Sequence, residues 1–89
     1  MSQKIIIESL AMDLKRVALG LHRGSLAVAE RFKEEAVKRS QELEKNDSQY
    51  LTNLVDKMRE CLALNSDRSA EDALMYSILF QNYSLKKYK

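Results

Sequence analysis

Apolar residues recur at spacings of three and four along most of this chain, and that spacing is the period of an α-helix. Residues three and four apart share a helical face, so each stretch predicts an amphipathic helix. The clearest stretches are Ile6, Leu10, Leu14, Val17 and Leu21, and then Leu51, Leu54, Val55, Met58, Cys61 and Leu62. The 89 residues include no Pro and only two Gly, whereas a β-sandwich or barrel needs many turn residues. The sequence therefore predicts an all-α fold.

Polar residues and glycine mark where the helices are expected to begin and end. Ser2 is the predicted N-cap of the first helix, and Gly24 followed by Ser25 predicts a break between the first helix and a second that runs to about Lys45. The apolar positions of that second helix are Leu26, Ala29, Phe32, Ala36 and Leu43, with Ser40 interrupting them. Asn46-Asp47-Ser48 predicts a turn and a new N-cap, the third helix ends near Asn65, and Ser69 is the predicted cap of the fourth.

Four helices of similar length with short connections predict antiparallel neighbours. The expected architecture is an up-down antiparallel four-helix bundle that forms a single helical domain over residues 1–89. An alternative stays open, because the apolar phase continues through Gly24 toward Val28 and Phe32. If residues 3–45 form one long kinked helix, the chain has three helices.

The last apolar stretch, residues 73–85, is apolar around most of the helix. One arc carries Leu74, Met75, Ile78 and Leu79, another carries Tyr76, Phe80 and Tyr83, and the polar residues left to face water are mainly Ser77, Gln81, Asn82 and Ser84. A helix that is apolar on several sides is usually buried on several sides, and a small bundle rarely covers so much. This pattern predicts a non-enzymatic interaction or regulatory module that self-associates as a homodimer through Met75, Leu79, Phe80 and Tyr83. An unidentified protein is the other partner that the pattern allows.

Arg16 and His22 suggest a rival function. Five residues separate them, which resembles the Arg-x(4–6)-His motif of the HEPN ribonucleases, a family of small all-helical proteins. The resemblance implies that Arg16 neutralises the scissile phosphate and His22 transfers a proton. Val17 stands where the family's motif has a polar residue, and the pair lies in the first helix rather than late in the fold. These two residues are the candidates for catalysis if the protein is an enzyme.

The charge distribution gives a third alternative. The net charge of +2 is small, and cations concentrate only in the C-terminal Lys86-Lys87-Tyr88-Lys89. This tail could bind nucleic acid weakly. The preceding helix begins with acidic residues and continues with apolar ones, which is unsuited to reading bases, so nucleic acid is not the expected main partner.

The sequence contains few groups for metal, cofactor or membrane binding. One Cys and one His exclude a Cys/His zinc site within one chain, and no Glu-x-x-His motif is present. We therefore expect no metal or cofactor, and we expect Cys61 to serve as a small buried apolar side chain. No stretch of about 18 apolar residues occurs, and the N-terminal segment lacks the apolar run of a secretory signal, so a cytoplasmic protein without membrane contact is expected.

Overall fold

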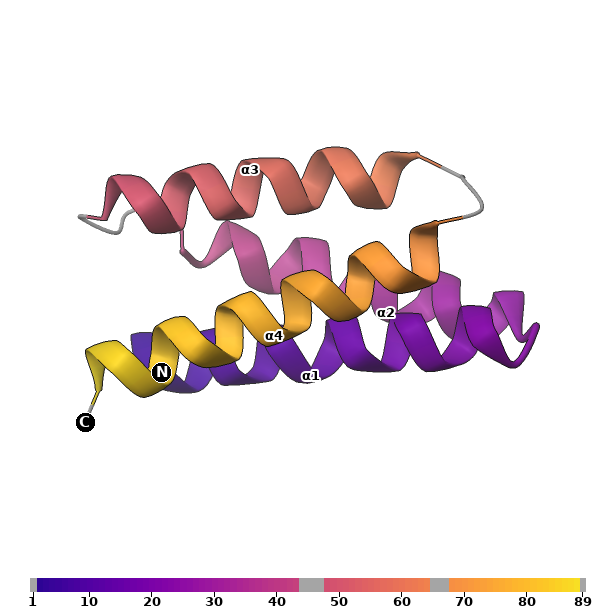
Figure 1. Cartoon of the computed structure of the whole chain (residues 1–89), viewed down its shortest axis with the longest axis horizontal. Helices are drawn as coiled ribbons and strands as arrows, with labels where there is room; N and C mark the ends of the chain where they lie inside the picture. The colour runs from indigo at the N-terminus through magenta and orange to yellow at the C-terminus, as the bar shows by residue number, and fades with distance from the viewer. Residues whose placement is uncertain (1, 44–47, 65–67, 89) are drawn as a thin grey trace.

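The computed structural model describes residues 2–43, 48–64 and 68–88, and this part of the chain forms four α-helices. They are α1 (Gln3–His22), α2 (Leu26–Gln41), α3 (Gln49–Ala63) and α4 (Ser69–Lys87). Each helix runs antiparallel to the one before it, and the N- and C-termini lie at the same end of the molecule (Figure 1). The predicted all-α, up-down four-helix bundle is confirmed.

The chain reverses direction between α1 and α2 where the sequence places its glycine. Gly24 has a φ of 76°, which is the left-handed region that glycine enters without steric cost. The Ser25 amide donates to the Gly20 carbonyl at 2.8 Å, and the Gly24 amide donates to the Leu21 carbonyl at 3.2 Å. This is the Schellman pattern, which satisfies the last carbonyls of α1. The structure thus decides between the two predicted arrangements in favour of two helices.

Two of the predicted N-caps are also present. The Ser2 hydroxyl accepts a hydrogen bond from the Ile5 amide at 3.3 Å, and the Ser48 hydroxyl accepts one from the Leu51 amide at 3.1 Å. The third prediction is wrong, because Ser69 is the first residue of α4 rather than its cap. Its hydroxyl instead donates to the Leu64 carbonyl at 3.3 Å, across the connection between α3 and α4.

The helices are arranged as a ring in which α1 lies between α2 and α4, and α3 closes the other side (Figure 1). In the described part of the chain the backbones of α1 and α3 do not approach each other, and neither do those of α2 and α4. Helix α1 packs extensively along both of its neighbours, whereas α3 meets α2 and α4 over shorter stretches. The first helix is therefore the main structural support of the bundle.

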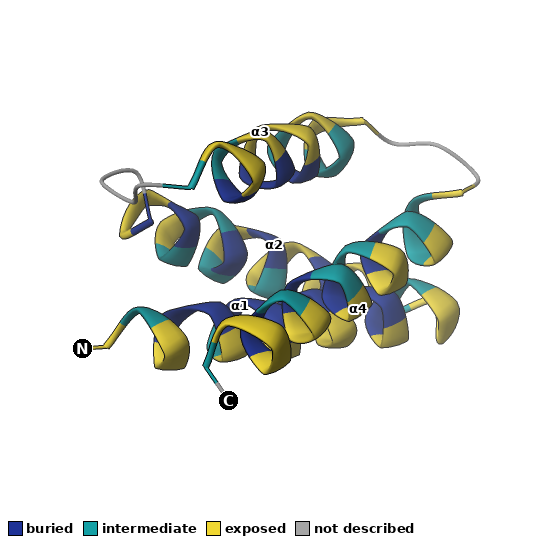
Figure 2. Ribbon diagram, turned by 60° about the vertical axis from the view of Figure 1, so that its left-hand side comes forward, coloured by how far each residue is buried: buried dark blue, intermediate teal, exposed yellow. Residues whose placement is uncertain are grey.

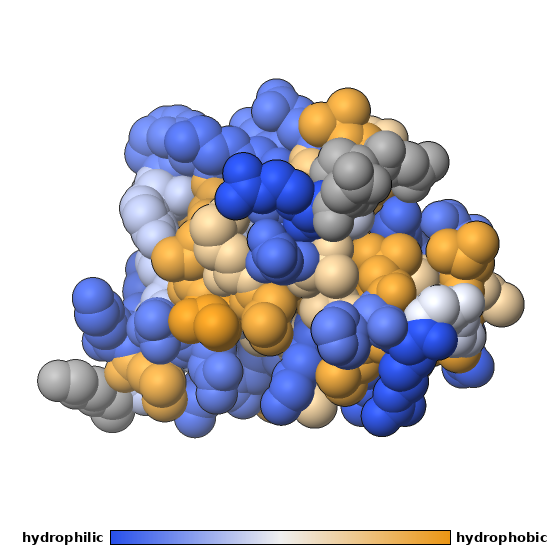
Figure 3. Space-filling view, turned by 45° about the vertical axis from the view of Figure 1, so that its right-hand side comes forward, coloured by the Kyte–Doolittle hydropathy of each residue, from blue (hydrophilic) through white to orange (hydrophobic). Residues whose placement is uncertain are grey.

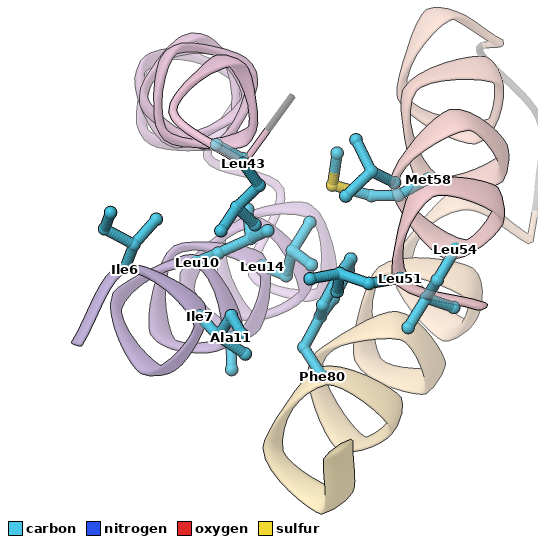
Figure 4. Close-up of a cluster of buried hydrophobic side chains, with 12 residues drawn as sticks. Ile6, Ile7, Leu10, Ala11, Leu14, Leu43, Leu51, Leu54, Met58 and Phe80 are labelled. Carbon is cyan, nitrogen blue, oxygen red and sulfur yellow. The ribbon is translucent and has the colours of Figure 1, made fainter. Parts of the chain in front are cut away.

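The hydrophobic core lies between α1, α3 and α4, with α2 contributing at one end. Figure 4 shows Phe80 pointing from α4 into the cluster, and Leu51 and Met58 entering it from α3. The core side of each helix is buried and the opposite side is exposed (Figure 2). The buried members of the main cluster are Ile6, Ile7, Leu10, Ala11, Leu14, Ala36, Leu43, Leu51, Leu54, Val55, Met58 and Phe80.

Helix α2 begins where it was predicted, but its end and the burial of one residue differ from the prediction. It ends at Gln41 rather than near Lys45, and the predicted turn at Asn46 and Asp47 lies outside the described residues. Leu26, which was expected on the buried face, is 67% exposed. It is the first residue of α2, and the tight turn through Gly24 leaves it beyond the end of the core. The buried residues of α2 are three small ones, Ala29, Ala36 and Ser40, together with Lys33.

Candidate interaction face

Small side chains determine how α4 sits on α1. The side of α4 that is buried consists of Ala73, Ser77, Phe80 and Ser84. The Ser77 hydroxyl donates to the Ala11 carbonyl of α1 at 2.7 Å, and the Ser84 hydroxyl donates to the Glu8 carboxylate at 3.3 Å. The two serines were expected to face water, and that expectation is wrong. Short side chains allow a close helix–helix approach, and each hydroxyl finds an acceptor, so burial costs little.

Because the buried side of α4 is made mainly of small residues, several of its large apolar residues point outward. Leu74, Met75, Ile78 and Leu85 are 44%, 45%, 49% and 62% exposed. Their spacing of one, three and seven residues places them in one stripe along the helix. Figure 3 shows apolar surface gathered in the middle of the side of the molecule on which α4 runs. We call these four residues the α4 stripe.

Helix α1 extends this surface. Met12 and Leu19 are seven residues apart on its outer side, and both are nearly half exposed. Leu19 and Leu74 line one hollow of about 350 Å³ along the seam between α1 and α4, and Met12 and Leu85 line a second of about 300 Å³. We call the α4 stripe together with Met12 and Leu19 the α1/α4 face. Isolated exposed apolar residues are normal on a protein surface, whereas a group of neighbouring ones is a candidate interaction site. Lys15 lines both hollows and Gln81 the second, so polar side chains lie among the apolar ones.

The four residues predicted for self-association differ in burial and lie on different sides of α4. Phe80 is fully buried in the core, so its side chain is not available to a partner. Leu79 and Tyr83 are partly buried and pack against the core cluster, on the side of α4 that faces α3. Met75 is exposed and belongs to the α4 stripe. The neighbouring residues Leu74, Ile78 and Leu85, which were not singled out for self-association, complete that stripe. The sequence already indicated that these three residues share one side of the helix, because Ile78 follows Leu74 by four residues and Leu85 follows Ile78 by seven.

Arg16 and His22 are not brought together in one protomer. They lie six residues apart on α1, which turns their side chains about 120° away from each other. The Arg16 guanidinium is 3.6 Å from the Asp13 carboxylate and 5.3 Å from the centroid of the Phe32 ring of α2. His22 instead lines the hollow beside Leu19 and Leu74. A shared catalytic cleft therefore does not form within the described chain.

Arg16 belongs to a charge cluster between α1 and α2 whose centre is Asp13. The Asp13 carboxylate is almost completely buried and accepts a hydrogen bond from Arg39 Nε at 2.8 Å. Burial raises the pKa of Asp13, although the hydrogen bond and the charges of Arg39 and Arg16 act in the opposite direction. The cluster links α1 and α2 through the pair of Asp13 and Arg39, which the sequence did not predict, and it engages Arg16 in packing rather than leaving it free for chemistry.

A third concave region lies between the start of α3 and the end of α4. It has a volume of about 520 Å³ and is lined by Tyr50, Leu79, Asn82, Tyr83, Lys86 and Lys87. The Tyr50 and Tyr83 rings are stacked, with their centroids 5.9 Å apart and their planes 17° apart. We call this region the Tyr50–Lys87 groove.

Cys61 lies near the other end of α3 and is partly exposed rather than buried. Desolvation, together with the neighbouring Asp72 carboxylate, raises the pKa of the Cys61 thiol. A reactive cysteine needs the opposite environment, which stabilises the thiolate. The structure therefore gives Cys61 no feature of a nucleophile.

The described residues contain no group of three or more His, Cys, Asp or Glu side chains that is arranged to hold a metal ion. Within the same residues, no helix combines the length and the apolar character required to cross a bilayer. The chain matches no protein-family model, no curated protein and no solved structure. The function must therefore be inferred from the geometry of the faces just described.

Proposed function

We propose that this protein is a helical interaction module that self-associates as a homodimer through the α1/α4 face. The observation that supports this most strongly is the α4 stripe, in which Leu74, Met75, Ile78 and Leu85 are each 44% exposed or more. Burying four large apolar side chains contributes on the order of 1.5–3 kcal/mol each when burial is complete. The four side chains are 44–62% exposed in the monomer, so roughly half of that free energy is left for a second copy to recover. The predicted cytoplasmic location is compatible with this role and stays a prediction.

The charges on α4 favour a second copy in an antiparallel orientation. Glu71 lies at the start of the helix and Lys86 at its end, both are exposed, and both border the α4 stripe. A two-fold axis close to Ile78 would place Glu71 of one copy opposite Lys86 of the other, and the reverse. The same axis would place Leu74 of one copy near Leu85 of the other. The face is thus complementary to itself, as a two-fold interface requires.

The first test measures the oligomeric state of wild type and of Ile78→Asp by light scattering or sedimentation over a concentration series that reaches the millimolar range. A charge at the centre of the interface should raise the dimer dissociation constant by about 30-fold or more, which is the effect of a central hot spot worth about 2 kcal/mol. Leu26→Asp is the matched control, because Leu26 is also an exposed apolar residue but lies on α2. Circular dichroism should show unchanged helix content in both variants.

A charge exchange tests the orientation. Glu71→Lys and Lys86→Glu should each weaken the dimer, because each places like charges opposite one another twice in the assembly. The double variant should restore association, since the two opposite charges are then merely exchanged. In a parallel arrangement Glu71 would face Glu71 and Lys86 would face Lys86 already in wild type, so the variants would not show this pattern of loss and rescue. Wild type that stays monomeric throughout the series, or an Ile78→Asp variant that dimerises as well as wild type, would overturn the proposal.

A further inference from the structure

The Tyr50–Lys87 groove lies outside the α4 stripe. It is formed by the first turn of α3 and the last turns of α4, and these two helix ends lie at the same end of the molecule (Figure 1). Lys87 and Tyr83 lie about 180° and 140° around α4 from Ile78, the centre of the stripe. Two groove residues adjoin the stripe: Asn82 lies about 40° around α4 from Ile78, and Lys86 about 80°. The groove can therefore be examined separately from self-association through Tyr50 and Lys87.

The groove offers an aromatic surface. Tyr50 is 56% exposed, and one side of its ring is stacked on Tyr83. The Tyr83 hydroxyl is buried and has no hydrogen-bond partner among the residues that the structure describes, so the groove presents the ring of this residue and not its polar atom. Leu79 contributes an apolar floor and Asn82 an amide that can both donate and accept hydrogen bonds. A planar group can thus stack on a pre-arranged pair of rings.

Among the described residues, the charged groups that line the groove are Lys86 and Lys87. Neither lysine forms an ion pair with any described residue. Lys87 Nζ lies 5.9 Å from the centroid of the Tyr83 ring, within the range of a cation–π contact. Lysines at a helix C-terminus also offset the helix dipole. The helix dipole accounts for the presence of lysines at the end of α4. It does not account for their position beside the stacked rings of Tyr50 and Tyr83.

We infer that the Tyr50–Lys87 groove binds a nucleotide, either free or as one unit of a single strand. The ammonium groups would bind the phosphate, and the base would stack on Tyr50. Stacking on aromatic side chains combined with a cationic groove is how proteins hold single-stranded nucleic acid without base pairing. A nucleotide carries both features, an anion and a flat ring, within the length of one groove. Basic charge in the C-terminal tail alone would give only salt-sensitive attraction to any polyanion.

The experiment is a titration of ¹⁵N-labelled protein, followed by NMR, with three probes: AMP, inorganic phosphate and a short single-stranded oligothymidylate. The resonances of Tyr50, Tyr83 and Lys87 should shift with AMP. Tyr50→Leu should weaken AMP binding by about tenfold, as expected for loss of one stacking contact. Lys87→Gln should weaken it several-fold. Lys38→Gln removes the same charge from an exposed position on α2 and should leave the affinity unchanged.

The three probes separate the sources of the ligand. Tighter binding of oligothymidylate than of AMP supports a strand as the ligand, and equal binding supports a free nucleotide. Phosphate that binds as well as AMP would overturn the inference, because the rings would then contribute nothing. Unshifted groove resonances, or equal losses in Lys38→Gln and Lys87→Gln, would overturn it as well. Tyr50→Leu and Lys87→Gln lie off the α4 stripe and should dimerise like wild type, so the two proposals can fail independently.

Discussion

Asp13 is an acidic side chain on the buried side of α1. It occupies the apolar phase between Leu10 and Val17, so the sequence does place it on the inner face. Its partner could not be identified in the same way, because Arg39 comes from α2, 26 positions along the chain. Periodicity tells which face a residue occupies, whereas pairing across helices depends on how the helices are rotated against each other. Spacing alone therefore suggested a role for Arg16 with His22, while the fold pairs Arg16 with Asp13.

Asp13 should make the stability of the protein depend on pH. Burial raises the pKa of Asp13 above its ordinary value of 3.8, so the folded state holds this proton more tightly than the unfolded state does. The contribution of Asp13 to stability is then most favourable below pH 3.8 and decreases as the pH rises through the folded pKa. The Asp13→Asn substitution would keep an acceptor for Arg39 but would remove the titrating group.

Urea denaturation of wild type and Asp13→Asn across acidic to neutral pH measures this effect. The free energy of unfolding of wild type, minus that of the variant, should fall as the pH rises from acid and then level off. Asp56→Asn, at an exposed position on α3, is the matched control for the loss of one carboxylate. A difference that rises with pH would show that Arg39 and Arg16 outweigh burial.

At the scale of the helices, the size of the inward-facing residues decides how each helix packs. The sequence showed that α4 is apolar around most of its surface, and that pattern is why α4 was the candidate for self-association. It did not show which side faces α1, because Ser77 and Ser84 look like exposed positions when hydrophobicity alone is considered. Small side chains at these positions allow α4 to pack closely against α1. Phe80 is buried as well, because it lies on the same side of α4 as the two serines.

The same requirement appears where α1 crosses α2. Gly20 is buried in α1, and a Cβ atom there would lie 3.0 Å from the Ala29 amide nitrogen and 3.3 Å from Ala29 Cα. Helix propensity alone would make Gly20→Ala stabilising by about 1 kcal/mol. A contact with backbone cannot be relieved by changing a rotamer, so the helices must separate, at a cost of about 1–3 kcal/mol.

We therefore expect Gly20→Ala to lower the free energy of unfolding by about 1 kcal/mol net, measured by urea denaturation. Gly24→Ala provides a comparison, because no atom lies within 4 Å of its Cβ position and only the positive φ of 76° opposes the substitution. An increase in stability for Gly20→Ala would show that α1 and α2 are not in close contact at this point.

For the whole molecule, the order of the helices and their antiparallel arrangement followed from the spacing of apolar residues. The sequence favoured four helices but left three open, and the turn at Gly24 decided between them. The unequal packing of the bundle did not follow from the sequence, since it depends on how much surface each pair of helices shares. Helix α1 has a packed neighbour on each side, while α3 meets its two neighbours over shorter stretches. Local stability follows the density of such contacts, so different helices of one small protein can open at different free energies.

Native-state hydrogen exchange should reveal this difference. Amides of buried α1 residues such as Leu10 and Leu14 should exchange only through global unfolding. Those of Leu54 and Val55 in α3, although also buried, should exchange at least about tenfold faster, through an opening in which α3 separates from an intact α1, α2 and α4. Because the side chains compared are all buried, the comparison isolates the contribution of helix packing.

Adding urea should bring the two sets of rates together near the unfolding midpoint. Equal rates without urea would mean that α3 unfolds only together with the other helices, and that the shorter contacts of α3 suffice for full cooperativity.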